Sequence, residues 1–175
     1  MASTRELEDG LPLIAPPGQN GDFATRKIAI YTTFYVEAAQ LERLEQDLRD
    51  ANEISDTAVA QLAPQPHFDS LLDIYNHHIQ LDTKEFAYDP RYFIVADQDD
   101  WTKEGVLFIN LAADTEQREC FVGVCRCDLE TCTQIKANLE VGNMDWVDYK
   151  EMEQDEFGGE NPYENPRYYP VDPSV

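Results

Sequence analysis

Three short apolar segments in the second half of the chain constrain its fold most strongly. They are Tyr92–Ala96, Val106–Leu111 and Cys120–Cys125, and each is rich in the β-branched and aromatic side chains that favour strands. The polar connections between them, residues 97–104 and 112–119, are short. A parallel return to the same sheet needs a crossover of about a dozen residues or more. We therefore predict that these three strands form an antiparallel meander.

Changes in hydrophobic period predict the elements on either side of the meander. Residues 28–35 alternate between two apolar sets, which is typical of a strand. Leucines at positions 41, 44 and 48 recur at helical intervals. The same reasoning predicts helices over residues 36–51, 57–62, 67–80 and 146–152, and a further helix between Asp128 and Gly142.

Capping residues mark the ends of the last two expected helices. Asp128 and Asp145 are suitable N-caps, and Asp148 stands at the third helical position after Asp145. Gly142 suits the residue just past a helix end. Helices clustered before and after a run of strands are typical of an α+β domain. We predict a single α+β domain in which an antiparallel sheet of three or four strands packs against several helices.

The two ends of the chain differ in composition from its middle. Residues 1–27 carry three prolines and three glycines with no hydrophobic period, which indicates a flexible, irregular arm. Residues 154–175 are acidic and rich in tyrosine and proline, and their four prolines disfavour helix and sheet. We therefore expect the folded domain to span residues 28–153 and the rest of the C-terminus to be an irregular tail.

The charge of the chain is strongly negative and lies mainly on the expected domain. The sequence holds 13 basic and 35 acidic residues, for a formal net charge of −22. Residues 28–150 hold 24 acids and nine bases, a net of −15, so the charge is not confined to the tail. Nucleic acids and anionic membranes repel such a chain, so we expect no direct nucleic-acid binding and no membrane association.

These features favour a cytoplasmic, non-enzymatic interaction protein. The N-terminus has no basic segment leading into an apolar one, and no apolar run approaches the length of a membrane helix. The glycine spacing excludes the common phosphate-binding loops, and no G-x-S-x-G nucleophile motif occurs. Our first hypothesis is an inhibitor-like or immunity-like protein that binds a basic protein partner. In a second hypothesis, the acidic domain has no specific binding role and its charge serves solubility.

A third hypothesis is a small metal-binding domain or a hydrolase-type enzyme. Asp73 and His77 lie four residues apart on an expected helix, a spacing that can hold a divalent metal. Asp97, Asp99 and Asp100 concentrate carboxylates in one loop, which suits calcium, although the order does not match an EF-hand. The simpler interpretation is an exposed Asp–His pair and a solvated loop, with no cofactor bound.

The four cysteines offer a zinc site or a reactive thiol. Cys120, Cys125, Cys127 and Cys132 form a compact C-x4-C-x-C-x4-C pattern, and four thiolates can hold zinc. On a strand, however, Cys125 and Cys127 point to the opposite face from Cys120. Cys125 and Cys127 are candidate reactive thiols, since Cys127 lies just before a helix N-terminus. Buried free thiols in the core are the simpler interpretation.

The tail contains one pattern that resembles a linear motif. Asn165, Pro166 and Tyr168 fit N-P-x-Y, in which a turn presents the tyrosine to a binding domain. The alternative is that the aromatic residues of the tail dock on the chain's own domain. Both interpretations remain open from sequence alone.

Overall fold

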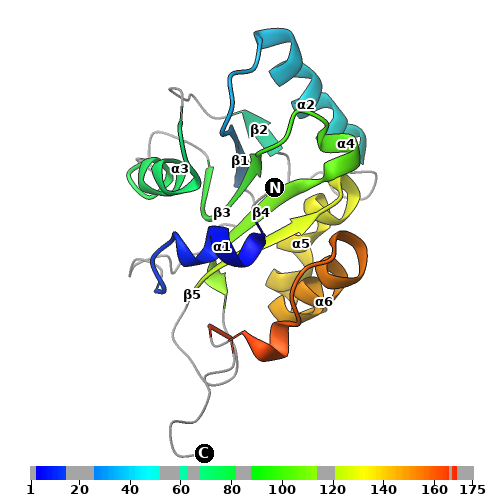
Figure 1. The fold of residues 1–175 in the computed structure, drawn as a ribbon. Coiled ribbons are helices and arrows are strands. Elements are labelled where there is room, and N and C mark those ends of the chain that lie inside the picture. Colours follow the sequence, from blue (N-terminus) through cyan, green and yellow to red (C-terminus); the bar gives the residue numbers. More distant parts are fainter. Residues whose placement is uncertain are drawn as a thin grey trace, which may run out of the picture.

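A computed structural model describes residues 3–14, 26–51, 60–62, 68–81, 88–113, 121–165 and 167–168. Its centre is a five-stranded mixed sheet with the strand order β2-β1-β3-β4-β5 (Figure 1). The strands are β1 (Lys27–Thr32), β2 (Ala60–Leu62), β3 (Tyr88–Ala96), β4 (Val106–Ala113) and β5 (Phe121–Cys127). Helices cover both of its faces, and the predicted α+β class is confirmed.

The antiparallel half of the sheet matches the predicted meander. β3 pairs with β4 and β4 pairs with β5, with Ile94 opposite Phe108 and Phe108 opposite Cys125. The connection from β3 to β4 contains a single helical turn, α4 (Trp101–Glu104). It ends at Gly105, whose φ of 70° lies in the left-handed region that glycine adopts at little cost.

The other half of the sheet is parallel, which the sequence analysis did not predict. β1 lies between β2 and β3 and runs parallel to both. The helix expected over residues 57–62 is wrong for Ala60–Leu62, because these three residues pair with β1 as a strand. The helices α2 (Ala38–Ala51) and α3 (Leu71–His78) lie in the two connections between the parallel strands, as such crossovers require.

The alternation within β1 separates two hydrophobic cores. Ile28 and Ile30 face the layer formed by α2, α5 (Leu129–Val141) and α6 (Trp146–Phe157). Ala29 and Tyr31 face the layer that contains α3 and Leu11 from the N-terminal segment. Successive side chains of β1 alternate between the two cores. The side chains on both faces of this strand are therefore apolar.

The described parts of both chain ends are ordered, which corrects the prediction of an irregular arm and an irregular tail. Residues Thr4–Asp9 form α1, which begins with a capping box between Ser3 and Glu6. α6 continues to Phe157, and a 3-10 turn, η1, follows at Pro162–Glu164. Both ends fold because they bury side chains against β5, and Glu8 and Tyr168 are almost fully buried. Within the described residues, no helix is long and apolar enough to cross a bilayer.

Candidate functional site

Most buried basic side chains neutralise buried acids. Arg126, 4% exposed, contacts Asp97 through two nitrogens, at 2.9 and 2.6 Å. Lys136 lies 2.9 Å from Asp89, and Lys150 forms an ion pair with Glu153. A buried charge without such a partner would cost several kcal/mol, so these bases are held inside the fold. They are therefore not available to balance the surface.

The surface that remains is almost wholly acidic. Only three basic residues are exposed in the described part of the chain, Arg43, Arg49 and Lys103, and each pairs with a nearby acid. Against these three, sixteen described acids are exposed: Glu6, Asp9, Glu37, Glu42, Asp50, Asp69, Asp73, Asp99, Asp100, Glu130, Glu140, Asp145, Asp155, Glu156, Glu160 and Glu164. The ratio of acids to bases is thus greater among the exposed described residues, sixteen to three, than in the whole chain, 35 to 13.

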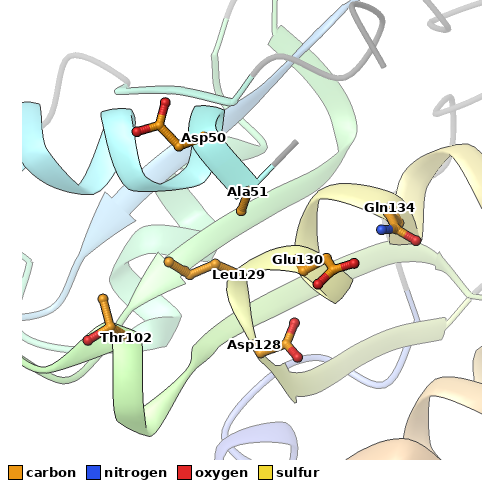
Figure 2. A pocket seen from close by; sticks show the side chains of 7 residues that line it. All are labelled: Asp50, Ala51, Thr102, Asp128, Leu129, Glu130 and Gln134. Carbon is orange, nitrogen blue, oxygen red and sulfur yellow. The ribbon is translucent and has the colours of Figure 1, made fainter. Parts of the chain in front are cut away.

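An acidic hollow lies where α2, α4 and the start of α5 meet (Figure 2). Its volume is about 410 Å³. Figure 2 shows the seven side chains that line it, which are Asp50, Ala51, Thr102, Asp128, Leu129, Glu130 and Gln134. Three of these carry a carboxylate and none carries a positive charge. The acidic hollow therefore combines three carboxylates with apolar surface from Ala51 and Leu129.

The direction of the strands brings the acids of this region together. β3 and β5 both run antiparallel to β4, so their carboxyl ends lie at the same end of the sheet. Asp99 and Asp100 follow β3, whereas Asp128 follows β5. The indole of Trp101 donates a 2.9 Å hydrogen bond to Asp47, which ties the loop to α2. A smaller hollow of about 100 Å³, whose lining includes Asp99, Asp100 and the basic residue Arg43, shares Thr102 with the first.

Two carboxylates of the acidic hollow accept hydrogen bonds from within the fold. Asp128 caps α5 by accepting a hydrogen bond from the Thr131 amide, and Asp50 accepts one from the Gln46 side chain. Outside the hollow, slight desolvation and then the negative charge of Asp128 raise the pKa of the exposed Glu156 on α6. The sequence analysis recognised Asp128 only as a cap and missed Asp50 and Glu130, because only the fold brings these three acids together.

Asp73 and His77 each contact other side chains of the fold. Asp73 is exposed and accepts a 2.7 Å hydrogen bond from the hydroxyl of Ser70, the N-cap of α3. The His77 ring packs against Phe68, with 5.1 Å between ring centroids. Nowhere in the described part of the chain do three histidines, cysteines or acids gather in a group that could hold a metal ion.

The acidic loop divides into a structural and an exposed part. Asp97 is held by Arg126 and is thus a structural partner of β5. Asp99 and Asp100 are exposed, and Asp100 accepts a 2.9 Å hydrogen bond from the Thr102 hydroxyl. Of the three candidate ligands, Asp97 therefore has a structural partner, whereas Asp99 and Asp100 are exposed to solvent.

The described cysteines are buried thiols in the core. Cys125, Cys127 and Cys132 are at most 3% exposed and form no disulfide. Burial, and for Cys125 the nearby Glu153 charge, raises the pKa of the Cys125 and Cys127 thiols well above their usual value. Raised pKa values and lack of access both oppose reactivity. Cys120, the fourth member of the pattern, lies outside the described residues.

The N-P-x-Y segment docks on the chain's own domain. Tyr168 is 1% exposed and donates a hydrogen bond from its hydroxyl to Glu8. Asn165 is also buried and donates a 3.3 Å hydrogen bond to the same carboxylate. Pro166 lies outside the described residues. In this conformation Tyr168 is not accessible to a partner, and the self-docking alternative holds for the described part of the tail.

Comparison with known proteins identifies one family. The model of a family described as "Domain of unknown function (DUF6924)" matches residues 27–159. No curated protein and no solved structure matches the chain at a significant level. The matched region contains all five strands, α2 to α6 and the acidic hollow, but neither α1 nor the docked residues 165–168.

Proposed function

The chain belongs to this family of unknown function, and we propose that it is a non-enzymatic protein that binds a basic protein partner through its acidic surface. The observation that carries this proposal is the distribution of charge between interior and surface. Three exposed bases, all paired with acids, face sixteen exposed acids in the described residues. Such a surface attracts basic proteins at long range and rejects acidic competitors.

The acidic hollow is the proposed centre of contact. Its carboxylates come from α2 and from the start of α5, so their positions are set by packed helices. Ala51 and Leu129 supply apolar surface beside them. An arginine or lysine of the partner would lay its apolar stem on this surface and place its charge among Asp50, Asp128 and Glu130. Asp99 and Asp100 add two carboxylates past Thr102, beside the single base Arg43, which pairs with Asp47.

The proposal includes three further features. The protein acts in the cytoplasm, where disulfides are rare and its thiols stay reduced. It binds neither nucleic acid nor an anionic membrane, because both carry the same sign of charge. Its binding requires no metal ion or other cofactor. Native mass spectrometry with and without a chelator tests the last feature, and a zinc or calcium ion bound at unit stoichiometry would favour the metal-binding alternative.

Paired charge variants test whether the acidic hollow is the contact site. The test variant carries Asp50→Asn and Glu130→Gln, whereas the control variant carries Asp69→Asn and Glu164→Gln. Both remove two exposed negative charges, but neither control residue lines the acidic hollow. Calorimetric titration with an oligolysine peptide at several salt concentrations measures the affinity of each protein.

We expect the test variant to bind the peptide about tenfold more weakly and the control variant less than about twofold more weakly. The affinity of the unaltered protein should fall as salt rises. Equal losses in both variants would mean that the acidic hollow has no special role. No measurable binding by the unaltered protein would leave an acidic domain whose charge serves solubility.

A further inference from the structure

β5 is the last strand of the sheet, yet its outer edge is closed in an unusual way. The main-chain groups of Val122 and Val124 that do not face β4 all have partners. The Val122 amide donates to the Leu13 carbonyl at 3.2 Å, and Ile14 forms an isolated antiparallel bridge with Phe121. An open edge is a template for pairing with another strand, so this closure has a physical consequence.

Side chains provide the remaining partners of this edge. The Val124 amide donates to Glu8 of α1 at 2.9 Å. The Val124 carbonyl accepts from Lys150 of α6 at 2.8 Å. The Val122 carbonyl accepts from Arg167 of the tail at 3.3 Å. Beyond the main-chain pairing with Leu13 and Ile14, the edge is thus closed by one acid and two bases from three separate segments.

Glu8 joins the two ends of the chain within this seal. Its carboxylate accepts hydrogen bonds from Tyr168 and Asn165, and its main-chain carbonyl accepts a 2.5 Å hydrogen bond from Arg167. Glu8 is fully buried, and burial raises the pKa of its carboxyl group. A buried carboxylate that lost the donors of the tail would be costly to keep in place. Likewise, if the N-terminal segment left, Arg167 would lose the carbonyls of Glu8 and Pro12 as acceptors and keep that of Val122.

We propose that α1 and the tail residues Asn165, Arg167 and Tyr168 form a single lock on the outer edge of β5. Neither end of the chain stays docked without the other, because each supplies buried hydrogen-bond partners that the Val124 amide and Lys150 alone do not replace for Glu8. When the lock opens, the main chain of Val122 and Val124 becomes accessible. Both parts of the lock lie outside residues 27–159, the region that matches the family, so the lock is an addition at the two ends of the domain. It controls access to an edge that β-strand addition would otherwise use.

Amide hydrogen exchange of the full chain tests this coupling. Asn165→Asp replaces a donor to Glu8 with a second carboxylate, while its remaining oxygen can still accept from the Arg167 amide. We expect exchange to accelerate about tenfold or more at the amides of Leu7 in α1 and Leu11 just after it, and also at Val122 and Val124. Exchange at the centre of β3 and β4 should stay unchanged.

Asn161→Asp is the matched control. Asn161 also donates to a carboxylate, that of Glu164, but its hydrogen bonds to described residues stay within η1, and aspartate preserves its capping role. This variant should exchange like the unaltered protein. If Asn165→Asp accelerates exchange in the tail while α1 and β5 keep their protection, the two ends dock independently and the lock does not exist.

A change at the other end tests the reverse direction of the coupling. Glu8→Gln preserves the size of the side chain and removes its charge, so it serves if Asn165→Asp fails to fold. Coupling is reciprocal, and we expect faster exchange at the amides of Arg167 and Tyr168 as well as at Val122 and Val124. Unchanged protection of the tail in this variant would overturn the proposal.

Discussion

The hydroxyl of Tyr168 donates a hydrogen bond to the carboxylate of Glu8, across 160 residues of sequence. Both side chains are almost fully buried, and the contact joins the N-terminal helix to the C-terminal tail over the edge of β5. A tyrosine in a region of simple, proline-rich composition thus belongs to the hydrophobic core. The stability of the fold should depend on it.

Removal of this hydroxyl should destabilise the protein without changing its shape. In Tyr168→Phe the ring still packs against Phe121, but Glu8 loses one donor. We expect a loss of about 1–2 kcal/mol in the free energy of unfolding, measured by urea denaturation. Tyr35→Phe is the control, because Tyr35 is 82% exposed and should change stability by less than about 0.5 kcal/mol. Equal stability of the two variants would contradict the role assigned to Tyr168.

Substitutions of the acids in the loop after β3 should differ in their effects on the stability of the protein. Asp97→Asn removes the charge that pairs with buried Arg126, and we expect a loss of about 3 kcal/mol in unfolding free energy. Asp99→Asn alters an exposed side chain and should change stability by less than about 0.5 kcal/mol. Guanidinium denaturation of both variants measures the difference. A stable Asp97→Asn protein would show that this ion pair is not needed for folding.

Acid should weaken the fold through His78. Its ring is buried beside Phe93 and shares a 3.0 Å hydrogen bond with Tyr31, and burial lowers its pKa from 6.5 to about 4. The unfolded chain therefore binds a proton below pH 6.5 that the folded chain rejects, so stability falls as pH drops toward 4.

The titration of His78 should lower the free energy of unfolding by about 2 kcal/mol between pH 7 and pH 5. Urea denaturation at both pH values, compared with that of His78→Gln, isolates it, because glutamine does not titrate. A ring proton signal that titrates near the ordinary histidine pKa in the folded protein would contradict this expectation.

The described thiols should be unreactive in the native protein. Cys125 donates a hydrogen bond to the Tyr149 carbonyl, Cys127 is 3% exposed, and both have raised pKa values. We expect iodoacetamide at neutral pH to leave Cys125, Cys127 and Cys132 unmodified until denaturant is added. Peptide mapping by mass spectrometry identifies each alkylated thiol. Rapid alkylation of Cys127 in the native protein would contradict this expectation and indicate a reactive thiol.

Local features of this protein could be predicted because they depend on neighbouring residues. Asp145 and Asp148 form the expected capping box of α6, and Gly142 ends α5 with a φ of 66°. The strands of the meander follow from their apolar runs and short connections. Hydrophobic period, capping and loop length act over a few residues, so they can be read from the chain itself.

Only the tertiary structure decided the contacts between segments that are distant in the sequence. The parallel pairing of β1 with β2 and β3 needs main-chain partners that no local pattern identifies. The acidic hollow exists because β3 and β5 have their carboxyl ends at the same end of the sheet. The sequence determined how much negative charge the chain carries, and folding decided where that charge lies. Buried bases take buried acids as partners, because an unpaired charge in the core is too costly.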